Sequence, residues 1–141
     1  MDWKKIVIET LGDHGPRKCA TEGIPIELHL IDCEIEITRK AVANGLPAEA
    51  VEDIQLFRIM MKRELEWALI QAKQRVAEVE KALNMLDPTE RIILDKLYIQ
   101  PEAISISRLS KDLHIAVSTM YRKRDIALRK FAIAMYDTEK R

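Results

Sequence analysis

The feature that most constrains the fold is a long stretch, residues 48–86, that contains neither Gly nor Pro. Apolar residues recur in it at intervals of three or four, at Met61, Leu65, Ala68, Ala72, Val76, Val79, Leu83 and Leu86. This spacing is typical of a helix that packs along one seam. Such a helix would be about 55–60 Å long, more than a small globule covers. We therefore expect the seam to pair with a helix at residues 24–43, in a hairpin, or with a second copy of the chain.

The first 23 residues predict a different structure. They contain Gly12, Gly15, Pro16 and Gly23 and have no sustained apolar period, so we expect an irregular arm. Pro25 suits the first turn of a helix that ends near Ala43. Gly45 is well placed as a left-handed cap before the next helix begins.

Composition indicates an all-α protein of one domain or two small ones. Nearly half of the 141 residues are apolar and a third are charged, while aromatic residues and β-branched runs are sparse. The N-terminus is too charged for a signal peptide, and no stretch reaches the roughly 20 apolar residues of a membrane helix. Two Cys do not make a disulfide framework. We therefore expect a cytoplasmic protein that binds no membrane.

A domain boundary is predicted at Asp87. Asp87 can cap a helix, Pro88 fits its first position and Glu90 completes a capping box. We therefore divide the chain into residues 1–86, with an arm and long helices for oligomerisation or interaction, and residues 87–141, a small helix-turn-helix domain. Three helices are expected in the second domain, one ending near Tyr98 and the others at residues 107–113 and 117–136.

The turn at residues 114–117 would join the last two helices as a helix-turn-helix. His114 is acceptable at a positive φ, and Ile115 would fill the angle between the helices. Met120, Ala127, Leu128 and Phe131 share one face, which we expect to bury against Ile93, Leu109 and Leu113. The opposite face would then point outward.

The outward face is basic, although the net charge of the chain is zero. Residues 1–86 hold 12 Lys or Arg against 15 Asp or Glu, whereas residues 87–141 hold 11 against 8. A local basic surface of this kind is what contact with DNA phosphates requires.

Helix-turn-helix geometry assigns candidate DNA contacts. Val117, Ser118, Tyr121 and Arg122 lie where base edges or sugars would be reached, with Arg122 suited to guanine. The remaining candidates are placed for contacts with the DNA backbone or lie within the same helical turns. The full predicted set of DNA-binding residues is Arg108, Lys111, Val117, Ser118, Thr119, Tyr121, Arg122, Lys123, Arg124, Arg129 and Lys130.

The residues that carry a family resemblance are 86–91, 109–113, 118–122 and 127–131. They resemble region four of bacterial sigma factors, and the whole chain resembles small phage and prophage regulators of the ArpU and RinA type. The resemblance covers residues 86–136 and implies a regulator of late genes whose exposed positions Val117, Ser118, Tyr121 and Arg122 read promoter DNA. It also implies a bacterial host, in which the protein would be nucleoid-associated. Nothing resembles the sigma region that binds the −10 element, so a complete sigma factor is not expected.

Other functions remain as alternatives. A helix-turn-helix with an oligomerisation helix also fits a small terminase subunit in DNA packaging, and it fits a module that docks on RNA polymerase. His14, Cys19, His29 and Cys33 have spacings open to a metal site, but no Cys-x-x-Cys pair is present and we expect none of them to bind metal. The acidic residues 27–36 have no accompanying catalytic group, so no enzyme activity and no cofactor are expected. The expected partners are double-stranded DNA, RNA polymerase and a second copy bound through the long helix.

Overall fold

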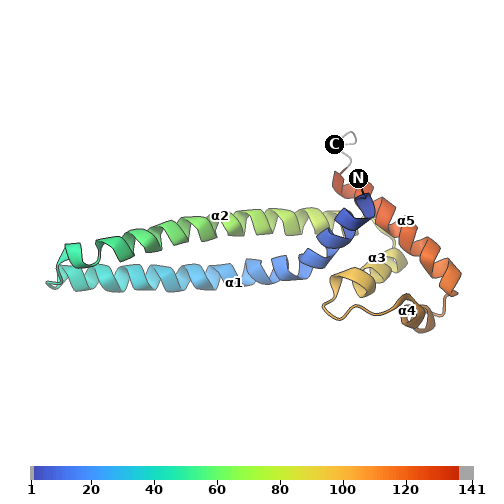
Figure 1. Ribbon diagram of the computed structural model, residues 1–141, viewed down its shortest axis with the longest axis horizontal. Helices are drawn as coiled ribbons and strands as arrows, with labels where there is room; N and C mark the ends of the chain where they lie inside the picture. Colours follow the sequence, from blue (N-terminus) through green and yellow to red (C-terminus); the bar gives the residue numbers. More distant parts are fainter. Residues whose placement is uncertain (1, 137–141) are drawn as a thin grey trace. The chain divides into compact units, whose positions relative to one another are not determined.

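The computed structural model describes residues 2–136, and this part of the chain is all-α (Figure 1). In chain order its elements are α1 (Trp3–Ala43), the 3-10 turn η1 (Ala48–Ala50), α2 (Glu52–Leu83), α3 (Pro88–Leu94), the π-helical turn η2 (Asp95–Ile99), α4 (Ile106–Leu113) and α5 (Val117–Tyr136). None of the helices in this range combines the length and the apolar character that crossing a membrane demands.

The chain divides into two compact units. The first, here called the head, contains the residues up to Arg17 together with those from Arg75 onward. The second, here called the hairpin, contains residues 18–74. The head is therefore larger than the predicted domain of residues 87–141, because the first part of α1 and the last part of α2 also belong to it.

The prediction of an irregular arm at residues 1–23 is wrong. α1 begins at Trp3 and continues through every Gly and Pro of that segment. Each Gly lowers helix stability by about 1 kcal/mol relative to Ala, but burial in the head outweighs that effect. Val7 and Leu11, both essentially inaccessible to solvent, and the buried Thr10 lie on one side of this part of α1. The head ends at Arg17, one residue after Pro16, which lacks the N–H for a backbone hydrogen bond of the helix.

The larger core of the head joins segments from both ends of the chain. Leu11 of α1 and Val79 and Leu83 of α2 pack in one cluster with Leu128 and Phe131 of α5. Phe131 is completely buried. The helix-turn-helix therefore packs against α1 and α2 as well as against α3, a dependence that local sequence signals do not predict.

A smaller core supports α4 directly. Ile93, Leu97, Leu109 and Met120 form it, with Leu113 and Ile115 packed at its edge. The predicted contact of Met120 with Ile93 and Leu109 is thus confirmed. Ala127, Leu128 and Phe131 are buried as predicted, but they belong to the larger cluster.

The start of α3 follows its sequence signals. Asp87 accepts a hydrogen bond from the Glu90 N–H at 2.7 Å, and Glu90 Oε1 accepts one from the Asp87 N–H at 3.0 Å. This is the predicted capping box, with Pro88 in the first turn. The α-helix ends earlier than predicted, at Leu94, and the chain continues to Ile99 as a π turn.

In the hairpin, α1 and α2 run side by side in opposite directions (Figure 1). Gly45 has a φ of 113° in the loop, in agreement with its predicted role as a cap. The helix is predicted to begin at residue 48, but residues 48–50 form the 3-10 turn and α2 begins only at Glu52. The predicted seam is divided: Val79 and Leu83 are buried in the head, whereas Met61 and Ala68 are exposed.

Candidate nucleic-acid interface

The turn between α4 and α5 is held by backbone and side-chain bonds. Ser105 caps α4 and accepts a hydrogen bond from the Arg108 N–H at 3.2 Å. The buried hydroxyl of Ser110 donates to the Ile115 carbonyl, and the Ser110 carbonyl accepts from the Ile115 N–H at 3.0 Å. His114 adopts the left-handed conformation, with φ 55° and ψ 43°. The tight turn that a helix-turn-helix needs is therefore present, and His114 occupies it as predicted.

The outward side of α5 carries part of the predicted set. Met120, Ala127, Leu128 and Phe131 bury one side of the helix. At 100° per residue, Ser118, Arg122 and Arg129 lie along a line on the opposite side. All three are exposed, and no ion pair is formed by Arg122 or Arg129 among the described residues. These side chains are available to a ligand in the conformation of this structure.

Tyr121 lies about 60° from Ser118 around α5, whereas Val117 lies about 100° from Ser118, toward the buried side of the helix. Because both residues are near the start of α5, they are still exposed, Val117 to 44% and Tyr121 to 47%. The Arg124 guanidinium stacks over the Tyr121 ring, 5.0 Å from its centroid. Arg124 also donates to Asp125 Oδ1 at 2.9 and 3.2 Å. Burial would raise the pKa of Asp125, but its bonds to Arg124 and the charge of Lys4 together lower it below the ordinary value. Arg124 therefore positions Tyr121 and neutralises Asp125, which leaves it less suited to a phosphate contact.

Two further predicted phosphate ligands face α3. Lys130 Nζ lies 3.0 Å from Oε1 of Glu90, a residue that is only 4% exposed. Lys123 is half-buried, and its charge helps to lower the pKa of Asp87, after the larger effect of the hydrogen bond from the Glu90 backbone. Both lysines are thus engaged at the capping box.

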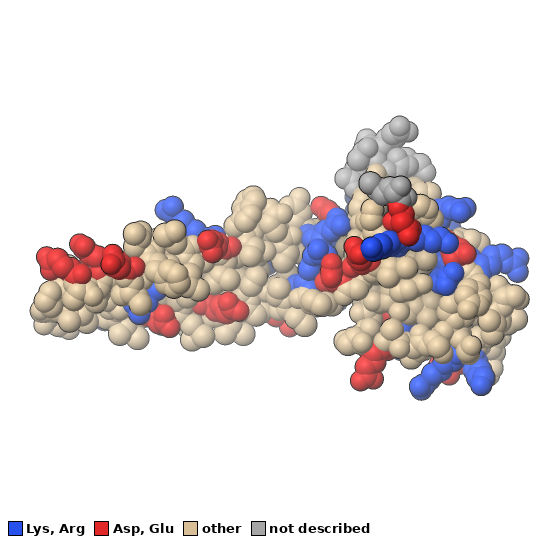
Figure 2. Space-filling view, in the orientation of Figure 1, with Lys and Arg blue, Asp and Glu red and all other residues tan. Residues whose placement is uncertain are grey.

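The remaining candidates divide in the same way. Arg108 and Lys111 are exposed on α4, and neither has an ion-pair partner within residues 2–136. Thr119 is half-buried next to Met120. Lys and Arg side chains gather over the helix-turn-helix part of the head in the view of Figure 2. The structure therefore brings Arg108, Lys111, Ser118, Arg122 and Arg129 to the surface of one helix pair.

The start of α1 adds two residues that sequence reasoning missed. Lys4 Nζ lies 3.4 Å from Asp125 Oδ1, and Trp3 lines a shallow hollow of about 370 Å³ with Arg129, Ala132 and Ile133. Lys4 thus contributes a positive charge beside α5. The signal was the pattern Val7, Thr10, Leu11, His14, whose spacing of three, one and three places an apolar side on a helix at the N-terminus.

The four residues considered for metal have other surroundings. His14 is 2% exposed, and its Nε2 lies 2.8 Å from Oε1 of Glu80, whose other oxygen accepts from Arg91 at 3.0 Å. Cys33 Sγ lies 3.6 Å from His29 Nε2, and Cys19 is exposed. Within residues 2–136 no three His, Cys, Asp or Glu side chains are grouped so that they could hold a metal ion.

Comparison with known proteins adds no relative: no family model, no curated protein and no solved structure matches this chain.

Proposed function

We propose that the protein is a sequence-specific DNA-binding regulator of transcription, of the kind found in phages and prophages, that acts on promoter DNA through α4 and α5. The observation that carries this proposal is the exposure of Tyr121 and Arg122 in the second turn of α5. Met120, the residue just before them, is only 1% exposed and anchors the helix in the core. A helix fixed in this way presents its N-terminal residues to a major groove.

Three further features support the proposal. α5 begins at Val117, one residue before Ser118, and a helix N-terminus attracts phosphate. Arg108 and Lys111 on α4 lie in the helix that crosses the sugar-phosphate backbone in this motif. The left-handed His114 fixes the angle between the two helices without a Gly.

The surface is less basic than the sequence alone indicates, because Arg124 and Lys130 have partners in the head. We therefore assign base contacts to Ser118, Tyr121 and Arg122, and phosphate contacts to Arg108, Lys111 and Arg129. With three such phosphate contacts, the logarithm of the binding constant would change with that of salt concentration by a slope of about −2.7 per monomer.

One observation favours a second candidate, docking of the helix-turn-helix on RNA polymerase. Ile126 and Ile133 are 44% and 42% exposed near Arg122 and Arg129. Apolar groups at the centre of an exposed surface are more typical of protein contacts than of phosphate contacts.

In vitro selection from a random pool of duplex DNA tests the choice. The full chain is expected to enrich a single short consensus at about 0.1 M salt. A binding-dead control is Arg108→Ala with Lys111→Ala and Arg122→Ala, three exposed positions with little effect on folding. If the wild-type chain recovers random DNA sequences and binds RNA polymerase, the proposal of DNA binding is contradicted and that of docking on polymerase takes its place.

A further inference from the structure

The hairpin lacks a core of its own. None of residues 18–74 is fully buried, in contrast to the head. Large apolar side chains remain open to solvent instead, with exposed fractions of 68% for Ile37, 59% for Phe57 and 63% for Trp67. A pair of helices that buries so little apolar surface gains too little free energy to stay folded unaided.

The contact between α1 and α2 is partly polar. Ile24, Leu28, Ile31 and Ile35 of α1 are half-buried along one seam. Toward the loop end of the seam, α2 contributes polar residues: Gln55 donates to the Ile35 carbonyl at 3.1 Å, and Arg58 donates to Thr38 Oγ1 at 2.8 Å. Farther from the loop, Leu65 and Leu69 of α2 are half-buried. The seam therefore fixes the pairing of the two helices but provides little apolar burial.

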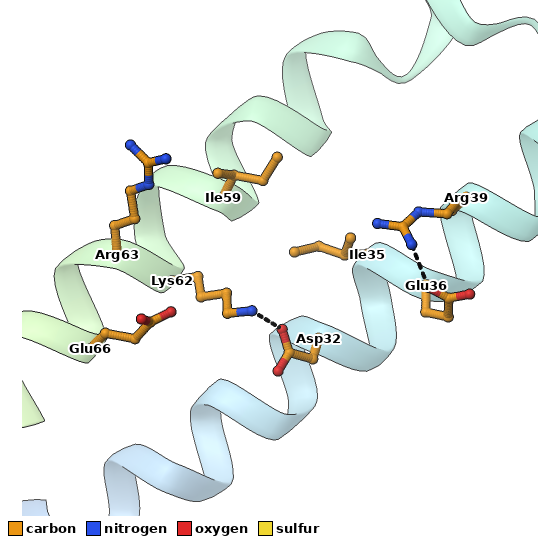
Figure 3. A pocket seen from close by; sticks show the side chains of 8 residues that line it. All are labelled: Asp32, Ile35, Glu36, Arg39, Ile59, Lys62, Arg63 and Glu66. Carbon is orange, nitrogen blue, oxygen red and sulfur yellow. Dashed lines mark ion pairs between the residues drawn. The ribbon is translucent and has the colours of Figure 1, made fainter.

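One side of the hairpin is charged (Figure 3). Lys62 Nζ lies 2.7 Å from Asp32 Oδ1, and Arg39 NH1 lies 3.2 Å from Glu36 Oε2. The hydrogen bond to Asp32 raises the pKa of Lys62 above its ordinary value. The shallow hollow on this side is lined by these residues with Arg63, Glu66, Ile35 and Ile59. This side is suited to water.

The other side is mainly apolar, although it also carries Glu34, whose Oε2 lies 3.4 Å from Nε of Arg58. On α1, Leu30 and Ile37 lie within about 60° of one another, and on α2 so do Ile54, Phe57 and Met61. These directions are turned by about 120–180° from Arg39 of α1 and from Arg63 and Glu66 of α2. All five apolar residues are exposed, and we call them the apolar face.

We propose that the apolar face is a homodimer interface, on which the same face of a second copy packs to give a four-helix bundle. Two helices about 10 Å wide offer roughly 540 Å² per copy if they pack over the about 27 Å between residues 23 and 41. That length includes residues that flank the apolar face, whose five members span only about 10 Å of each helix. Two copies would thus bury roughly 1,100 Å², close to the lower end of about 1,200 Å² for stable interfaces. The accessible surface of the chain, 9710 Å², also exceeds by roughly 2,200 Å² the value of about 7,500 Å² for a compact monomer of this mass.

A second copy is the occupant that fits best, for two reasons. A face without which the hairpin has no core needs a partner that is present wherever the chain folds, and another copy of the chain meets that condition. On α2 the face has a spacing of three and four, at Ile54, Phe57 and Met61, and on α1 a spacing of seven, at Leu30 and Ile37. An identical face offers the same spacing, so that side chains of one copy enter the gaps of the other. This inference does not depend on DNA binding.

Light scattering of the purified full chain tests the proposal. The chain has a mass of 16.3 kDa, and we expect twice that mass at micromolar concentration. Leu30→Lys with Phe57→Lys would bury four cations in the dimer, so this variant is expected to be monomeric. The matched control, Ile59→Lys with Ile70→Lys, changes two exposed isoleucines toward the charged side and is expected to remain dimeric.

Helix content by circular dichroism accompanies each measurement. If the lysine variant loses helix, Leu30→Ala with Phe57→Ala replaces it, and its dissociation constant for the dimer is expected to rise at least tenfold. A monomeric wild-type chain overturns the proposal, as does a ring of eight or more copies, which would favour a packaging role. A dimer that the apolar-face variants leave unchanged also overturns it, and none of these outcomes affects the DNA selection experiment.

Discussion

Lys130 Nζ lies 3.0 Å from Oε1 of Glu90, which is the same oxygen that accepts the Asp87 N–H at the start of α3. The Glu90 side chain is 6% exposed and that of Lys130 51%. A cation from α5 thus compensates a buried carboxylate that caps another helix. Its neighbour Arg129 is exposed and has no such partner among the described residues.

Replacement of these two adjacent cations by Ala is expected to affect the stability of the fold differently. Lys130→Ala leaves the Glu90 carboxylate without its cation, so we expect the free energy of unfolding to fall by about 1–3 kcal/mol. Arg129→Ala is expected to change it by less than about 0.5 kcal/mol. Urea unfolding measures both.

In DNA binding, the Arg129 variant is expected to show the larger effect and the Lys130 variant the smaller one. Arg129→Ala is expected to make the salt dependence of binding less steep by about 0.9, whereas Lys130→Ala leaves the slope nearly unchanged. Equal slopes for the two variants, or a steeper loss with Lys130→Ala, would show that the assignment of phosphate contacts is wrong.

His14 joins the start of α1 to α2. Its Nε2 lies 2.8 Å from Glu80 and it is 2% exposed, so His14→Ala removes a buried ring and a charge-assisted hydrogen bond. We expect the free energy of unfolding to fall by about 2–4 kcal/mol. His29→Ala is the matched control, because His29 is exposed on the same helix, and it is expected to change stability by less than about 0.5 kcal/mol. Equal effects would contradict the place of α1 in the head.

His114 holds a left-handed conformation, which costs a residue with a Cβ about 1–2 kcal/mol. Gly avoids this cost, but it loses more chain entropy on folding, and this loss offsets part of the gain. His114→Gly is therefore expected to raise the free energy of unfolding by about 0.5–1 kcal/mol. His114→Val, whose β-branched side chain resists a positive φ, is expected to lower it by more than that. Destabilisation by Gly would mean that the His114 side chain makes a contact essential to the turn.

Asp87 makes stability depend on pH in the acid range. The hydrogen bond from the Glu90 backbone, with the charges of Lys130 and Lys123, lowers its pKa below the ordinary value of 3.8. A carboxyl whose pKa is lower in the folded chain stabilises fully above pH 3.8, and that contribution is lost as the pH falls through the folded value.

Asp87→Asn separates the charge from the cap, because Asn also accepts an N–H at a helix start. The wild-type chain is expected to lose more stability than the Asn variant between pH 5 and pH 2, measured by urea unfolding in steps of about half a pH unit. Parallel curves for the two proteins would exclude a contribution from this carboxylate.

Local signals predicted the helix-turn-helix closely. The Asp87–Glu90 box, the left-handed His114 and the span of α5 all depend on residues a few positions apart, so they can be inferred from spacing alone. The division of α5 into a buried and an exposed side followed from the same period.

Long-range packing explains what the sequence did not reveal. Gly and Pro in residues 12–25 indicated a break, whereas Leu11 and His14 are buried among residues from Val79 onward, and this burial keeps the segment helical. The partners of Arg124 and Lys130 could not be assigned from charge alone either. A run of basic residues does not show which of them meet a carboxylate elsewhere in the fold.

The most direct test of the DNA function is the affinity of Arg122→Ala for the selected duplex, measured by fluorescence anisotropy at fixed salt. A lost bidentate contact to guanine corresponds to about 1–3 kcal/mol, so we expect binding to weaken by roughly 5- to 150-fold and the preference at one base pair to relax. Lys73→Ala, an exposed cation of the hairpin, is the matched control and is expected to bind like the wild-type chain. Unchanged affinity and unchanged base preference in Arg122→Ala would contradict the assignment of α5 as the helix that reads DNA.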